Sequence, residues 1–128
     1  MPKTISVPTR CTLCPRRCGA DRAAGRTGFC GAGATLKAAR AALHHWEEPC
    51  ISGERGSGAV FFAGCPLGCV YCQNYALSRG RIGKTVSVER LAAIFAGLEA
   101  KGVHNLNLVT GTQFTPEIRE ALAIAKPK

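Results

Sequence analysis

The chain has 128 residues, of which 46% are hydrophobic and 20% charged, and its formal net charge is +9. This composition is typical of a globular domain and excludes a disordered chain. The apolar runs are far shorter than the roughly 18 residues of a membrane span, and the first residues lack the apolar core of a secretory signal. We therefore expect a cytoplasmic protein with no membrane partner.

The segment up to about residue 33 is rich in Gly, Arg and Cys and poor in large apolar side chains. It cannot bury enough apolar surface to fold alone, so we expect a metal or the rest of the chain to order it. Cytosolic thiols stay reduced, which favours metal ligation over disulfides. Zinc, a second iron-sulfur cluster and metal-free thiols remain open for this candidate second metal site. Its four cysteines are Cys11, Cys14, Cys18 and Cys30.

The next two predicted elements precede a second group of cysteines. Residues 35–48 are rich in Ala and have high helix propensity, so they predict a helix that Pro49 ends. The short apolar run at residues 59–63 lies between two glycines and predicts a strand buried on both faces.

Two helices and a strand are predicted after the second group of cysteines. Ser87 is the expected N-cap of a helix at 88–101, which has apolar residues at helical spacing and ends at a glycine. Residues 103–110 predict a second strand. Thr115 is the expected N-cap of a last helix, with proline in its first turn.

The order strand, helix, strand, helix predicts a parallel α/β unit. A sheet of only two parallel strands leaves both edges open, so we expect an incomplete domain that continues or is completed by another chain. We divide the chain into a Cys-rich N-terminal segment, 1–57, and an incomplete α/β domain, 58–128.

A loop with three cysteines, Cys65, Cys69 and Cys72, follows the first predicted strand. Ligands of α/β folds bind at this end of a parallel strand. Soft thiolates select zinc, copper(I) or iron-sulfur clusters. A structural zinc ion needs four ligands, whereas a cubane cluster can be held by three and leave one iron open. The spacing favours a cluster, and a zinc knuckle with a fourth ligand such as Cys50 is the alternative.

At this loop the sequence resembles the radical S-adenosylmethionine (radical SAM) superfamily. The signature Cys-x3-Cys-x-aromatic-Cys is matched by Cys65, Cys69, Tyr71 and Cys72. The longer stretch EEPCISGERGSGAVFFAGCPLGCVYCQNY resembles the branch related to activating enzymes of pyruvate formate-lyase. The resemblance implies that the chain holds the first strand-helix units of a partial (β/α)6 radical SAM barrel, apparently truncated, behind the Cys-rich segment.

The resemblance also implies an enzyme and its cofactors. The three cysteines of the signature would hold a [4Fe-4S] cluster, and its open iron would bind S-adenosylmethionine and cleave it to a 5′-deoxyadenosyl radical for hydrogen abstraction. Tyr71 would lie near the adenine. The turn that binds the methionine amino group in the family corresponds to Thr110, Gly111 and Thr112, and it lacks the glutamate often found there.

The positive charge suggests an acidic electron donor such as a flavodoxin or ferredoxin. The substrate is unreadable from these residues; one option is a protein, as for enzymes that activate glycyl radical enzymes. Aromatic residues do not alternate with the basic ones, which argues against nucleic acid. The alternative function is a zinc-binding basic module that interacts with nucleic acid or a protein partner. Cys50 has no assigned role.

Overall fold

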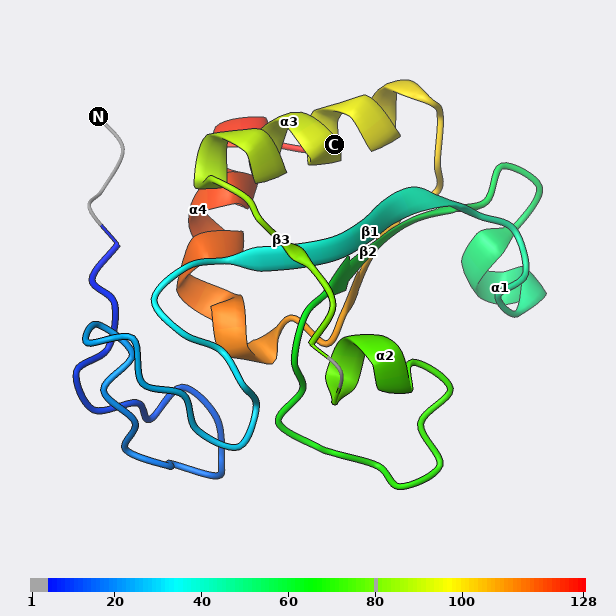
Figure 1. Cartoon of the computed structure of the whole chain (residues 1–128). Helices are drawn as coiled ribbons and strands as arrows, with labels where there is room; N and C mark the ends of the chain where they lie inside the picture. Colours follow the sequence, from blue (N-terminus) through cyan, green and yellow to red (C-terminus); the bar gives the residue numbers. More distant parts are fainter. Residues whose placement is uncertain (1–4, 80) are drawn as a thin grey trace.

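The computed structural model describes residues 5–79 and 81–128 (Figure 1). Its strands are β1 (Lys37–His44), β2 (Ser57–Phe62), β3 (Lys84–Thr85) and β4 (Leu106–Val109). Its helices are α1 (Pro49–Ser52), α2 (Tyr75–Ser78), α3 (Val88–Ala100), the 3-10 turn η1 (Thr112–Phe114) and α4 (Thr115–Ala125). The chain is therefore a mixed α/β structure, compatible with a partial radical SAM domain.

The four strands form one sheet in the order β3-β1-β2-β4. β2 and β4 are parallel, and the register pairs Gly58 with Leu106 and Phe61 with Val109. This confirms the parallel pair, and it puts the loop after β2 beside the turn after β4. β1 is antiparallel to β2 and covers the edge that a two-stranded sheet would have left open.

The hydrophobic core lies where α3 and α4 pack against each other and α3 packs on the sheet (Figure 1). β2 is buried almost throughout because its unbroken apolar sequence faces covered surfaces on both sides. The apolar stripe of α3 supplies Leu91, Phe95 and Leu98 to this core. The other large core side chains are Val60, Phe62, Phe114 and Ile118.

The predicted helix at residues 35–48 is wrong, because most of this stretch is β1. Trp46, which follows β1, is 91% exposed. Helix propensity distinguishes ordinary residues by less than about 1 kcal/mol each, so tertiary context overrides it. Here the backbone from Ala38 to His44 pairs with the open edge of β2. Pro49 does not end a helix but lies in the first turn of the short α1.

The later elements agree better with the sequence. Ser87 is the N-cap of α3 as predicted, since its side chain accepts a hydrogen bond from the backbone N–H of Arg90 (3.1 Å). The second strand is shorter than expected, because only Leu106–Val109 pairs with β2. Thr115 is not an N-cap: it is the first residue of α4, and its hydroxyl donates to the Thr112 carbonyl (2.7 Å).

The N-terminal segment has no regular helix or strand between residues 5 and 36, and a buried arginine attaches it to the core. Arg22 is 1% exposed. Its guanidinium donates to the carbonyls of Gly33 (2.9 Å) and Gln113 (2.7 Å). This segment consequently lies at the same end of the sheet as the loop after β2, drawn in green in Figure 1. Within the described residues, no helix has the length and apolar character of a membrane span.

Candidate functional site

The three-cysteine loop leaves β2 through a glycine that no other residue replaces easily. Gly64 has φ +81°, and an added Cβ would collide with the carbonyl oxygen of Cys30. This close approach lets the backbone N–H of Cys65 donate to that same carbonyl (3.1 Å). Gly68 also has positive φ (+70°), which turns the loop between Cys65 and Cys69. The loop thus depends on glycine at both bends.

Hydrogen-bond donors reach two of the three sulfurs in this loop. The backbone N–H of Leu67 points to the Cys65 sulfur (3.4 Å), and the Ser78 hydroxyl to the Cys72 sulfur (3.5 Å). The backbone N–H of Cys72 donates to the Cys69 carbonyl (3.3 Å). All eight cysteines are free thiols. In residues 5–79 and 81–128, no three Cys, His, Asp or Glu side chains are gathered closely enough to hold a metal ion as they stand.

Cys65 is the loop thiol whose ionisation the surroundings change. Burial by itself raises its pKa, but the neighbouring Thr110 side chain and the backbone N–H groups of Gly68 and Leu67 lower it. The nearby Arg79 guanidinium acts in the same direction. The net effect is a pKa below the ordinary value, which favours the thiolate, the form that binds metals.

The turn after β4 is tied to the loop after β2. Thr110 has φ +55°, an uncommon conformation for a β-branched residue, and its hydroxyl donates to the Gly64 carbonyl (3.0 Å). The Gln113 side-chain amide donates to the carbonyls of Ala63 (3.1 Å) and Gly64 (3.0 Å). The sequence analysis did not propose Gln113 as a site residue. Its position directly after Thr110, Gly111 and Thr112 was the available signal.

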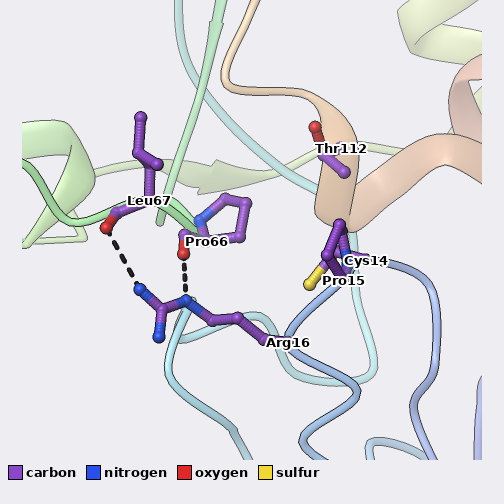
Figure 2. A pocket seen from close by; sticks show the side chains of 6 residues that line it. All are labelled: Cys14, Pro15, Arg16, Pro66, Leu67 and Thr112. Carbon is purple, nitrogen blue, oxygen red and sulfur yellow. Dashed lines mark hydrogen bonds between the residues drawn. The ribbon is translucent and has the colours of Figure 1, made fainter.

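A cavity of about 490 Å³ lies between these two segments and the N-terminal segment. Figure 2 shows Pro66 and Leu67 of the cysteine loop, Thr112 of the turn, and Cys14 and Pro15 beside them. A second cavity, of about 310 Å³, borders Thr110, Gly111 and Thr112 on the side of α4. Of the residues predicted to bind the methionine group, Thr112 therefore borders both cavities, and the first of these also borders the cysteine loop.

Two arginines hold the loop by its carbonyl groups. Arg16 donates to the carbonyls of Pro66 and Leu67 (Figure 2), and Arg79 donates to the carbonyl of Cys65. Both guanidinium groups stack on Phe29, at 3.5 Å for Arg16 and 4.4 Å for Arg79. The meeting of these two arginines on one aromatic ring was not predicted from the sequence.

The remaining predicted residues occupy different surroundings. Tyr71 is 87% exposed beside the loop. Cys11, Cys14, Cys18 and Cys30 all border one small cavity next to Pro66. Cys50 is exposed on α1 and takes no part in either group.

Comparison with known proteins agrees with the chemistry of this loop. The family model of the radical SAM superfamily matches residues 59–128, which is more than half of the chain and includes most of β2, the cysteine loop and the turn after β4. Comparisons with curated proteins and with solved structures returned no match. A three-cysteine loop at the end of a buried parallel strand, together with this match, leads to one conclusion: the chain belongs to the radical SAM superfamily.

Proposed function

We propose that this chain holds a [4Fe-4S] cluster on Cys65, Cys69 and Cys72 and binds S-adenosylmethionine beside it. When bound, the pair supplies a 5′-deoxyadenosyl radical that abstracts hydrogen from a substrate. The observation that carries the proposal is the placement of all three signature cysteines in the region matched by the superfamily model.

The donor set of the loop fits an iron-sulfur cluster. Three thiols are the ligands such clusters use, and the lowered pKa of Cys65 favours its ligating form. The contacts of Leu67 and Ser78 with the sulfurs of Cys65 and Cys72 would tune a bound cluster. The thiols have to turn toward one another on binding, which the half-exposed side chains permit.

The 490 Å³ cavity supports a place for S-adenosylmethionine, since its volume lies in the usual range for small-molecule sites. Thr112 on one wall would face the methionine group, and Leu67 on another would exclude water from it. In this proposal Tyr71 closes over the adenine, which its present exposure leaves it free to do. Thr110 and Gln113 hold the turn against the loop, so that both walls keep their spacing.

The finer proposal is an activating enzyme related to those of pyruvate formate-lyase, with a protein as substrate. It rests on the resemblance of the segment around the cysteine loop to that branch. The net charge of +9 supports an acidic electron donor, such as a flavodoxin or ferredoxin. Arg16 and Arg79 add positive charge at the loop itself. Electron transfer that does not weaken with added salt would contradict this choice of donor.

Anaerobic reconstitution with iron and sulfide tests the cluster and its activity together. The chain should become brown and, with a strong reductant, release methionine and 5′-deoxyadenosine from S-adenosylmethionine. Cys65→Ala, Cys69→Ala and Cys72→Ala should each abolish that release. Cys50→Ala is the matched control, because Cys50 is exposed on α1, and it should keep full activity. A chain that stays colourless, or cleavage that survives loss of a signature cysteine, would refute the assignment.

A further inference from the structure

Four cysteines of the N-terminal segment surround one small cavity, which is separate from the three thiols of the loop. Cys11, Cys14, Cys18 and Cys30 all border it, together with Pro66 and Gln113. Its volume is about 10 Å³. That is room for about one water-sized body, which is the scale of a single ion.

Two backbone hydrogen bonds close a loop around part of this cysteine group. The N–H of Cys11 donates to Ala20 (3.0 Å), and the N–H of Gly19 donates back to Cys11 (3.0 Å), which closes a loop containing Cys14 and Cys18. Gly19 has φ +69° and follows Cys18 directly. The sulfur of Cys18 packs on Gly28, where a Cβ would lie only 2.5 Å from it. The loop therefore brings Cys18 next to Gly28, which is close in sequence to Cys30.

The sulfur of Cys30 makes the same kind of backbone contact as the sulfur of Cys65 in the cysteine loop. The N–H of Ala32, two residues further on, reaches the Cys30 sulfur at 3.4 Å, and the N–H of Leu67 reaches the Cys65 sulfur in the same way at the same distance. Cys30 also has a glycine after it with φ +78°. Cys30 and Cys65 thus share this backbone contact to the sulfur, although the glycine with positive φ lies one residue after Cys30 and three residues after Cys65.

We propose that Cys11, Cys14, Cys18 and Cys30 bind one tetrahedral, thiophilic metal ion of the size of Zn²⁺. Four thiolates form a closed structural zinc site, and the Cys-x2-Cys pair of Cys11 and Cys14 has the usual spacing. Binding releases the thiol protons and draws the sulfurs together, with exposed Cys18 moving most. The segment has almost no core of its own, so the ion supplies folding free energy that apolar burial does not.

The ion also braces the cluster loop. The carbonyl of Cys30 accepts from the N–H of Cys65 (3.1 Å), so a ligand of one centre is hydrogen-bonded to a ligand of the other. Arg16, between Cys14 and Cys18 in sequence, holds the carbonyls of Pro66 and Leu67 (Figure 2). Loss of the ion therefore loosens two attachments of the loop at once.

Metal analysis of a chain that lacks the loop thiols isolates this site from the proposed cluster. In the full chain carrying Cys65→Ala, Cys69→Ala and Cys72→Ala, we expect about one zinc ion per chain after expression with zinc. Replacing zinc with Co²⁺ should give the intense sulfur-to-cobalt charge-transfer bands of thiolate ligation. Adding Cys18→Ser or Cys30→Ser should lower zinc content at least tenfold under dialysis, whereas adding Cys50→Ser should leave it unchanged.

Each result has one meaning. A triple variant that binds no zinc, or that keeps zinc after Cys18→Ser, overturns the proposal. Iron and acid-labile sulfide in the triple variant would also overturn it, because they show a second cluster in place of an ion. The Co²⁺ spectrum is also recorded for the chain without substitutions. This control shows whether a missing signal in the variants comes from misfolding. If the chain without substitutions bound zinc but no iron after reconstitution, the cluster at Cys65, Cys69 and Cys72 would be contradicted. The proposed zinc site would stand.

Discussion

The most demanding test of this architecture is Gly64→Ala, because it adds one methyl group where the cysteine loop meets the N-terminal segment. The new Cβ would collide with the Cys30 carbonyl, which already accepts from the N–H of Cys65. Gly64 also has φ +81°, which an L-residue adopts only under strain. The N–H and the carbonyl of Gly64 are themselves bonded, to Leu77 and to Thr110, so the backbone has little freedom to shift.

The cost follows from three terms. Left-handed backbone costs an L-residue about 1–2 kcal/mol. Displacing the Cys30 carbonyl loses its hydrogen bond from Cys65, worth about 1 kcal/mol. Forcing a methyl group into filled space adds about 1–3 kcal/mol. We therefore expect Gly64→Ala to lower the free energy of unfolding by about 3–6 kcal/mol, a large part of the stability of a small domain.

Gly102→Ala is the matched control. Gly102 has nearly the same φ, +78°, but an added Cβ there meets nothing within 4 Å. We expect Gly102→Ala to lower the free energy of unfolding by only about 1–2 kcal/mol, which is the cost of left-handed backbone in an L-residue. Urea denaturation of both variants measures the difference, and iron content after reconstitution shows whether the loop of Gly64→Ala still binds. Equal destabilisation of the two variants would refute the contact between the cluster loop and Cys30.

Three further predictions concern single side chains. Ser87→Ala should lower the free energy of unfolding by about 1 kcal/mol through loss of the α3 cap, without changing iron content; an unchanged urea midpoint would contradict it. Arg22→Lys should cost about 2–4 kcal/mol, because an ammonium cannot span the carbonyls of Gly33 and Gln113, and a loss no larger than that of an exposed Arg→Lys change would count against it. The lowered pKa of Cys65 makes the thiolate contribution to stability present above the ordinary thiol pKa of 9.0 and lost as pH falls through the folded pKa. Urea midpoints of the metal-free chain should thus decline toward lower pH more than those of Cys65→Ser, and parallel profiles would disprove this.

The elements predicted correctly are those in which local pattern and tertiary environment agree. α3 has an N-cap at Ser87 and an apolar stripe, and both remain visible in its packing. β2 is an unbroken apolar run and is buried, as such runs are. The β1 segment was predicted incorrectly, because its Ala content favours helix locally while the edge of β2 offers a hydrogen-bonding partner only in the folded chain.

In the candidate site, too, the features that depend on local sequence were predicted and those that depend on long-range contacts were not. The thiol spacing of Cys65, Cys69 and Cys72 is local, so it could be read directly from the chain and already indicated the cluster chemistry. The contacts of Gln113 with Gly64, and of Arg16 with Pro66, join residues about fifty positions apart that share no sequence pattern. They depend on how the parallel strands align their ends.

The sequence by itself determined the superfamily and the three thiols that we propose as ligands, since a run of eight residues contains all three thiols and the aromatic residue between them. The tertiary structure decided that the N-terminal cysteines border one cavity and that Cys30 is hydrogen-bonded to Cys65. Long-range contacts of this kind arise from packing and backbone satisfaction over the whole chain, and no short stretch of residues encodes them.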